Sequence, residues 1–293
     1  MSAHVLFIHL QRVLPDGGMQ RCKKQKSNIF QMKIIFIGAG NLATNFAKAL
    51  VAAGHDVLQV YSRTMESAQR LAMTAGGAPV CSLDAVSGDA DVYIIAVKDS
   101  VLPEIIPQVC SGKGEKVFCH TAGSMPMSLF EGQALHYGVL YPMQTFSKER
   151  DVNFREIPCF IESSDSVADS VLRQLAGSVS DRVMPLSTDN RRYLHLAAVF
   201  ASNFVNHCYG IAGDLIGKCG LPFDVLLPLI DETARKVHEL PPVKAQTGPA
   251  VRYDENVIRA QSSMLRGNPI VKDLYDRMSM SIHARQMKEE GKK

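Results

Sequence analysis

The sequence predicts an α/β protein, in which a doubly wound Rossmann domain is followed by an all-α C-terminal domain. Between residues 33 and 185, short apolar stretches alternate with helical patterns, as in parallel sheets that carry helices on both faces. A glycine-rich turn, Gly38-Ala39-Gly40, directly follows the first of these stretches. Beyond residue 188 only helical patterns remain. We therefore expect an N-terminal extension over residues 1–31, a dinucleotide-binding domain over 32–187 and a helical domain over 188–293.

The elements of the first domain follow from the spacing of apolar residues. Short β-branched runs that are apolar throughout indicate strands buried on both faces, and apolar residues at helical spacing indicate the helices. Pro103 falls in the first turn of its helix, where the missing N–H costs little. In chain order, the expected strands are 33–37, 57–61, 91–97, 116–119, 137–141, 157–162 and 182–185, and the expected helices are 42–53, 65–75, 101–109 and 166–176.

The second domain begins with one long helical pattern, residues 189–219, which contains no proline and ends before Gly220. Further helices are expected over 222–240, 254–265 and 269–288, with Asp254 and Asn268 as N-caps of the last two. The segment between residues 241 and 253 is predicted to be a loop.

The composition excludes several classes of protein. Hydrophobic residues make up 46% and charged residues 21% of the chain, as in ordinary globular proteins. A net charge of +3 is too small to indicate a nucleic acid or an anionic membrane as partner, and no apolar run approaches the roughly 20 residues of a membrane span. The seven cysteines form no CxxC pair, so we expect no metal site and a reducing, cytoplasmic location. Residues 1–31 lack the pattern of a signal peptide and are expected to be a disordered extension or an overlong start.

The glycine-rich turn predicts a dinucleotide site. The first glycine allows a tight turn after the strand, the second lets the backbone approach a pyrophosphate, and the third position, here alanine, packs the helix against the sheet. The pyrophosphate is then expected on the free N–H groups at the start of the helix. The predicted cofactor-binding residues of this turn are Gly38, Ala39, Gly40, Asn41, Leu42 and Ala43.

The end of the second strand favours NADP over NAD. An NAD site usually offers an acidic residue there for the ribose 2′-OH, whereas this chain has Ser62, Arg63 and Thr64. The two hydroxyls can donate to a phosphate, and the guanidinium can pair with a 2′-phosphate or lie on the adenine. The alternative is that Arg63 is a solvated cation.

Longer segments resemble a known family. They are residues 33–50, 117–124, 140–146, 195–206 and 248–254, and the likeness covers residues 32–288. The chain resembles the oxidoreductases that join an NADP-binding Rossmann-like domain to a helical domain of unknown function, some of which are described as deazaflavin- or NADP-dependent. The resemblance implies that Ala96, Val97 and Lys98 lie beside the ribose and nicotinamide, although a solvated Lys98 is the alternative.

A more distant resemblance is to the 6-phosphogluconate dehydrogenase superfamily, in which the helical domain builds the substrate cleft and usually forms the dimer. Its β-hydroxyacid dehydrogenases carry a Lys-x-x-x-Asn motif on the long helix. If Asn203 corresponds to that asparagine, the lysine position is Val199, and the usual proton donor is missing. Prephenate dehydrogenases have a His-Pro motif where this chain has Tyr141-Pro142. Neither mechanism therefore transfers directly.

Three polar residues are expected to be catalytic: His120, His195 and Asn203. His120 ends a strand, where ligands gather in open α/β sheets, and a histidine suits proton transfer near neutral pH. An equally open alternative is that it only bonds the backbone. On the long helix, His195, Val199, Ser202 and Asn206 share an α-helical stripe with Asn203 on its flank, facing either a cleft or a core or dimer interface.

Four residues are expected on the substrate side. Ser124 follows His120, Tyr141 and Gln144 follow the next strand, and Arg252 could bind a substrate carboxylate or phosphate in a bidentate manner. Core packing is the alternative for Tyr141.

Two hypotheses of function follow. The first is an NADP-dependent oxidoreductase that moves hydride between nicotinamide and a small, anionic carbonyl, imine or alcohol substrate in the interdomain cleft, as a homodimer formed by the helical domain. The second is a non-catalytic NADP-binding regulatory or scaffold protein, which the missing lysine at position 199 keeps open.

Overall fold

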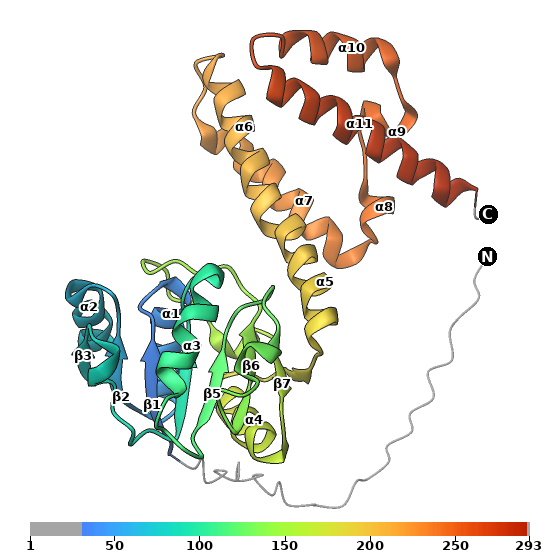
Figure 1. Cartoon of the computed structure of the whole chain (residues 1–293). Coiled ribbons are helices and arrows are strands. Elements are labelled where there is room, and N and C mark those ends of the chain that lie inside the picture. Colours follow the sequence, from blue (N-terminus) through green and yellow to red (C-terminus); the bar gives the residue numbers. More distant parts are fainter. Residues whose placement is uncertain (1–30, 292–293) are drawn as a thin grey trace, which may run out of the picture. The chain divides into compact units, whose positions relative to one another are not determined.

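A computed structural model describes residues 31–291 of the chain (Figure 1). The expected extension, residues 1–31, lies outside this range except for its last residue. The chain divides into two compact units, the first ending at Tyr193 and the second beginning at Leu194. The division falls within one helix, α5 (Thr188–Ala198).

The first unit is built on an eight-stranded sheet with the order β3-β2-β1-β4-β5-β6-β7-β8. All neighbouring strands pair in parallel except β6 and β7, which are antiparallel. Strand order reverses between β1 and β4, which is where open α/β sheets bind ligands. The strands are β1 (Lys33–Ile37), β2 (Asp56–Tyr61), β3 (Ala78–Val80), β4 (Val92–Ile95), β5 (Val117–His120), β6 (His136–Pro142), β7 (Cys159–Ser163) and β8 (Val183–Pro185).

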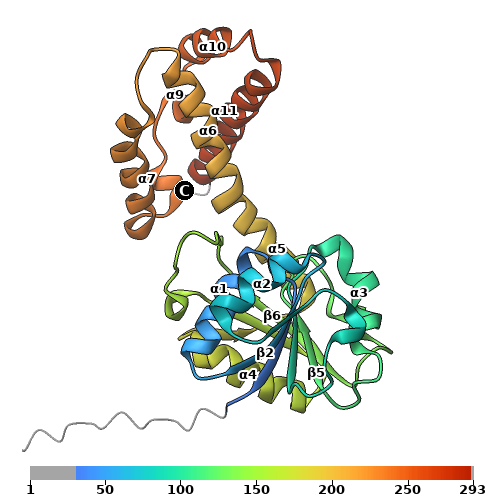
Figure 2. The same ribbon diagram turned by 90° about the vertical axis from the view of Figure 1, so that its left-hand side faces the viewer.

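Helices cover both faces of this sheet, as the prediction of a doubly wound fold requires. They are α1 (Asn41–Ala52), α2 (Met65–Ala75), α3 (Leu102–Cys110) and α4 (Ser166–Val179). One core lies between the sheet and α1, α2 and α4, and the other lies under α3 (Figure 2).

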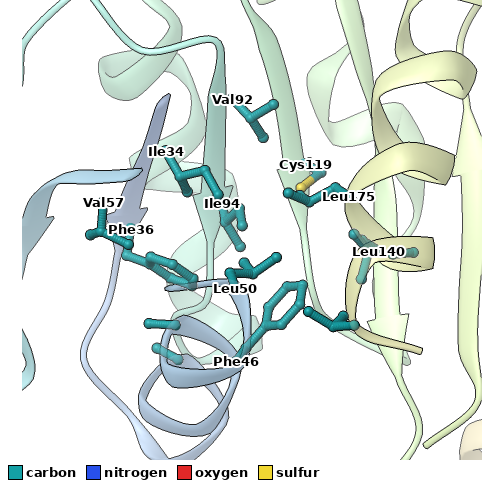
Figure 3. Packing of buried hydrophobic residues seen from close by; sticks show 14 of the residues in the cluster. Ile34, Phe36, Phe46, Leu50, Val57, Val92, Ile94, Cys119, Leu140 and Leu175 are labelled. Carbon is teal, nitrogen blue, oxygen red and sulfur yellow. The ribbon is translucent and has the colours of Figure 1, made fainter. Parts of the chain in front are cut away.

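Successive side chains of β1 point to opposite faces of the sheet, so this strand contributes residues to both cores. Ile34 and Phe36 belong to the first core, and Ile35 and Ile37 to the second; all four are fully buried. In the first core, Phe46 of α1 meets the ring of Phe36 edge to face at 6.1 Å (Figure 3). This packing fixes α1, and with it the glycine-rich turn before it, on the sheet.

A buried histidine, His55, bonds its neighbours at the N-terminal end of β1, the end away from the glycine-rich turn. The Nδ1 atom of His55 accepts from the backbone N–H of Met32 at 3.2 Å, and its Nε2 lies 2.9 Å from the hydroxyl of Ser178. That hydroxyl in turn donates to the carbonyl of Leu175 in α4. The chain of donors is complete only with a neutral ring, and burial lowers the pKa of His55 accordingly.

Up to residue 291, the second unit is built from helices and the loops that connect them. The predicted long helix is α5, a π-helical segment (Val199–Phe204) and α6 (Val205–Gly217) in direct succession. Asp254 and Asn268 cap α10 and α11 as predicted, accepting from Val257 and Val271. The other helices are α7 (Leu227–Glu239), α8 (Pro242–Ala245), α9 (Pro249–Arg252), α10 (Glu255–Met264) and α11 (Pro269–Glu290).

Three local predictions were wrong. The strand β3 was missed because it has only three residues and contains Pro79. The segment predicted as a loop before Tyr253 holds the short helices α8 and α9, each with a proline in its first turn. The predicted helix over 222–240 starts with a 3₁₀ turn, Phe223–Leu226, before α7. None of the helices within residues 31–291 has the length and apolar character to cross a membrane.

Candidate functional site

A pocket of about 500 Å³ opens at the carboxyl ends of β1, β2 and β4, where the strand order reverses. A further wall that the sequence did not predict comes from Glu104, Ile105 and Gln108 of α3 and from its N-cap residue Val101. Eight of the predicted cofactor-binding residues line the pocket: Gly38, Ala39, Gly40, Ser62, Arg63, Ala96, Val97 and Lys98. The other four, Asn41, Leu42, Ala43 and Thr64, do not.

Glycine occupies positions 38 and 40 of the turn for two different physical reasons. Gly38 has φ +117°, and a Cβ there would lie 2.3 Å from the carbonyl oxygen of Ala96, so only glycine fits. At Gly40 a Cβ would meet nothing within 4 Å, and no side chain caps α1 at this position. The N–H groups of the first turn therefore remain available for an anion, with open space above Gly40. Ala43 is fully buried in the core, as its packing role predicts.

Hydroxyls and a cation gather at the end of β2. Ser62 and Arg63 line the pocket together with Ser67 from the first turn of α2, which the sequence analysis missed. Thr64 is the N-cap of α2, and its hydroxyl donates to Ser67 at 2.9 Å. Arg63 is exposed and has no hydrogen bond or ion pair with any residue in the described range, so its guanidinium is free to bind a phosphate.

The segment after β4 contributes both a wall and a polar contact. Lys98 is exposed, lines the pocket and forms no ion pair within the described part of the chain. The next residue, Asp99, accepts a short hydrogen bond from the hydroxyl of Ser124. Arg192 donates to the carbonyl of Ser124 at 3.2 Å. The predicted substrate residue Ser124 is thus held between two elements of the first unit.

His120 is fully buried, and both ring nitrogens contact the backbone. Nδ1 accepts from the N–H of Ala122 at 3.2 Å, and Nε2 lies 3.3 Å from the carbonyl of Pro126, to which it donates. Burial lowers the pKa of His120 to about 4, against a smaller opposing effect of the Pro126 hydrogen bond. The arrangement matches the alternative in which His120 bonds the backbone.

Tyr141 near the end of β6 and Gln144 two residues after this strand differ in burial. Tyr141 is 8% exposed, and burial, with Asp99 next in the same direction, raises the pKa of its phenol; Arg191 opposes the shift. The phenol is therefore protonated near neutral pH and can donate a hydrogen bond. Gln144 is exposed, and its side-chain oxygen accepts from the N–H of Thr145 at 2.8 Å.

A buried ion pair that the sequence analysis missed lies beside these residues. Arg191 is 1% exposed, and its Nη1 donates to Glu162 at 2.5 Å, while its Nη2 donates to the carbonyl of Met125 at 2.6 Å. Thr188 completes the network by donating both its N–H and its hydroxyl to Glu162 at 2.8 Å. Burial alone would raise the pKa of Glu162, but the hydrogen bonds from Arg191 and Thr188 outweigh it and leave this pKa below its usual value. No local signal marks the pair, because the two residues lie far apart in the sequence.

In the second unit, the π-helical segment changes the predicted stripe. A pure α-helix turns by about 100° per residue, which places Asn203 about 80° from His195. In the wider π-turn between Val199 and Phe204, each residue rotates the chain about the helix axis by less than about 100°. Asn203 therefore lies closer to the face of His195 than in a pure α-helix. Ser202 and Asn206 move away from that face, which corrects the prediction for these two. Asn203 is exposed and His195 is half-buried.

Arg252 is the last residue of α9 and is exposed. The next residue, Tyr253, has φ +53°, which is uncommon for a bulky side chain, and its ring lies 4.8 Å from that of His283. The ring contact holds the turn that presents Arg252. Within residues 31–291, no cluster of three or more His, Cys, Asp or Glu side chains could hold a metal ion.

The chain is similar over both units to known proteins. Residues 33–119 match the family described as NADP oxidoreductase, coenzyme F420-dependent, and residues 157–282 match a domain of unknown function, DUF2520. A solved structure from Bacteroides fragilis, described as an NADP oxidoreductase, is 52% identical, with 87% of this chain and 99% of that chain covered and a TM-score of 0.84. The chain belongs to this family of NADP oxidoreductases. The family resemblance and the cofactor NADP that the sequence predicted are thereby confirmed.

More distant structures share the fold of this NADP oxidoreductase family. A protein from Thermotoga maritima is 20% identical, covering 86% of this chain and 99% of that chain, with a TM-score of 0.69. The imine reductase from Myxococcus stipitatus, in complex with NADP+, is 15% identical, covering 86% and 93%, with a TM-score of 0.63. A comparison with curated protein sequences found no match.

Proposed function

We propose that this NADP oxidoreductase transfers hydride between NADP and a small, anionic carbonyl, imine or alcohol substrate. The observation that carries the proposal is the pocket at the reversal of strand order, lined by Gly38, Gly40 and Arg63, which has no ion pair with any residue that the structure describes. The fold shared with the imine reductase and with a pyrroline-5-carboxylate reductase from Coxiella burnetii supports a carbonyl- or imine-type substrate. NADP, when bound, supplies or accepts the hydride at its nicotinamide ring.

The pocket residues are assigned roles toward the cofactor. The free N–H groups that follow Gly40 bind the pyrophosphate, because a helix start attracts negative charge. Arg63, Ser62 and Ser67 bind the 2′-phosphate, the group that separates NADP from NAD. Lys98 lies on the ribose and nicotinamide side.

Substrate binding and proton transfer are assigned to residues outside the dinucleotide pocket. Tyr141 donates a hydrogen bond to the polar atom of the substrate, since a phenol is protonated at neutral pH and burial raises the pKa of this one further. The helical unit contributes His195 for the proton, Asn203 for orientation and Arg252 for the negative charge of the substrate. We assign the proton to His195 in place of His120, because both ring nitrogens of His120 contact the backbone.

We also propose that the helical unit forms a homodimer. Large apolar side chains of this unit are solvent-exposed in the single chain, among them Phe200 at 62%, Leu229 at 64% and Ile270 at 83%. Large exposed apolar side chains on one unit are a feature of surfaces that bind a partner, and this is the support for the proposal. A cytoplasmic location is proposed with it, in keeping with cysteines that form no CxxC pair.

The test combines binding and turnover. NADPH and NADH binding is measured by nucleotide fluorescence for the wild type, Arg63→Ala and, as control, Arg70→Ala, whose side chain pairs with Glu66 outside the pocket. Arg63→Ala should weaken NADPH binding about 10- to 100-fold, leave NADH binding unchanged and so remove the preference between them. NADPH oxidation is then followed with keto acids, cyclic imines and an oxidised deazaflavin. Tight NADPH binding without oxidation by any of them would support the non-catalytic alternative.

A further inference from the structure

We propose that Asn41 is a positioning residue that couples occupation of the dinucleotide pocket to the order of a segment after β6. We call this segment, residues 143–151, the strap. The inference rests on the proposed function, because it requires NADP in the pocket. It adds a role for Asn41, whose side chain bonds the strap and does not line the pocket.

The strap has little backbone support of its own. Its first residues bond the body of the sheet, with the N–H of Met143 donating to Pro158 at 2.9 Å and that of Gln144 to Pro142 at 3.2 Å. From residue 145 to residue 151 no backbone–backbone hydrogen bond joins the strap to another element that the structure describes, and residues 148 and 149 form only a local turn. Its position therefore depends on side chains.

Those side chains come from one face of α1. The amide of Asn41 donates to the carbonyl of Phe146 at 3.0 Å, and the amide of Asn45 donates to the carbonyl of Ser147 at 2.9 Å. One turn further, Lys48 pairs with Asp151 at 3.0 Å. Residues 41, 45 and 48 lie above one another on a helix, so the strap runs along the face that they form.

An aromatic contact holds the middle of the strap. The ring of Phe146 stacks on Phe154 at 5.8 Å, and Phe154 stacks on Phe46 of α1 at 5.3 Å. This contact keeps the carbonyl of Phe146 near the start of α1, where Asn41 reaches it. The amide of Asn41 then sets the final position of the backbone beside the glycine-rich turn.

Asn41 is also the first residue of α1, directly after Gly40 of the pocket. Its own side chain does not line the pocket, since its amide is used by the strap. A phosphate bound at the start of α1 fixes the backbone of this first turn, which fixes the amide of Asn41 and the carbonyl that it holds. Two events that stabilise the same conformation increase each other's equilibrium constants by the same factor.

The coupling has a consequence for the substrate side. The strap carries Gln144, which the sequence predicts to contact substrate, and it begins two residues after Tyr141. Binding of NADP would thus order the substrate-side strap before the substrate arrives.

The strap offers a direct readout, because Lys148 and Arg150 are trypsin sites within it. Cleavage at these two residues is followed by mass spectrometry in the full-length protein, with and without saturating NADP+, and NADPH affinity is measured in parallel. The variants are Asn41→Ala, Asn41→Ser, in which serine suits a helix start but is too short to reach Phe146, and Asn45→Ala as matched control. Melting curves confirm that each variant is folded, and the serine variant replaces the alanine variant if that one is not.

We expect NADP+ to slow cleavage of the wild type. Loss of one solvent-accessible hydrogen bond should reduce this protection roughly two- to tenfold in the Asn41 variants and weaken NADPH binding by the same factor. Asn45→Ala should raise cleavage without nucleotide and keep the protection. Protection that is equal in the wild type and the Asn41 variants, absent in a wild type that binds NADP+, or lost equally in Asn45→Ala would overturn the proposal. A wild type that binds no NADP+ would instead overturn the proposed function.

Discussion

The carboxylate of Glu162 at the end of β7 and the guanidinium of Arg191 in α5 form a buried ion pair with an N–O distance of 2.5 Å. Thr188, the first residue of α5, donates to the same carboxylate. The pair therefore fixes the start of the helix that carries His195 one turn after Arg191. Arg191 is almost fully buried, and within residues 31–291 its one ion-pair partner is Glu162, beside the neutral acceptor Met125.

Breaking this pair should destabilise the protein strongly. In Glu162→Leu, the buried Arg191 loses its counter-ion, and we expect the free energy of unfolding to fall by roughly 3–5 kcal/mol, measured by urea denaturation. The control is Glu66→Leu, which removes an exposed pair on α2 and should cost less than about 1 kcal/mol. Equal effects of the two substitutions would show that the buried pair has no special role.

The two glycines of the pocket should respond differently to alanine. Gly40→Ala should fold with an unchanged melting temperature, because its Cβ enters open space, but it should weaken NADPH binding at least tenfold by filling the approach of the pyrophosphate. Gly38→Ala should be unstable, because its Cβ clashes with the carbonyl of Ala96. Melting curves and nucleotide fluorescence distinguish the two, and unaltered NADPH binding by Gly40→Ala would argue against a pyrophosphate there.

Acid should destabilise the protein through His120. Its pKa is about 4 in the folded state and about 6.5 when unfolded, so the unfolded chain takes up the proton first as the pH falls. The contribution of His120 is complete above pH 6.5 and is lost progressively down to pH 4, by roughly 3 kcal/mol. His55, whose pKa is also lowered, acts in the same direction.

The measurement is the free energy of urea unfolding at pH 7.5, 6 and 5 for the wild type and His120→Gln. The variant should lose stability less steeply on acidification, because the remaining titrating groups are common to both proteins. Identical slopes would contradict a neutral, buried His120.

The proposed dimer makes Phe200 a sensitive position. Its exposed ring packs edge to face on Phe204 at 4.9 Å within the π-helical segment. Phe200→Asp should shift the sedimentation coefficient from that of a dimer to that of a monomer, because a charge in an apolar interface is costly. Met73→Asp is the control, at an 88% exposed position of α2. A wild type that sediments as a monomer would refute the dimer itself.

Most of the first unit could be predicted because its strands are short apolar runs that end in glycine or polar residues. The glycine-rich turn could be predicted for the same local reason. By contrast, the antiparallel direction of β7 depends on its pairing with β6, and the partnership of Glu162 with Arg191 spans distant elements. The position of His120 after a strand left open whether it is catalytic or bonds the backbone, because its hydrogen bonds with Pro126 and Ala122 are a tertiary property. Local patterns carry no information on such contacts.

The π-helical turn between Val199 and Phe204 leaves the long helix with one residue more than an uninterrupted α-helix needs in that span. Winding the same residues as a regular α-helix, with none removed, would rotate everything after Phe204 by about 100° relative to α5. Deleting a single residue there, such as Ala201, would restore regular α-helical hydrogen bonding and leave α6 facing as it does now. Regular winding without the deletion would instead turn Asn203 away from the face of His195 and re-aim the apolar face of α6. The extra residue of this segment therefore sets which side chains of α5 and α6 face the same way.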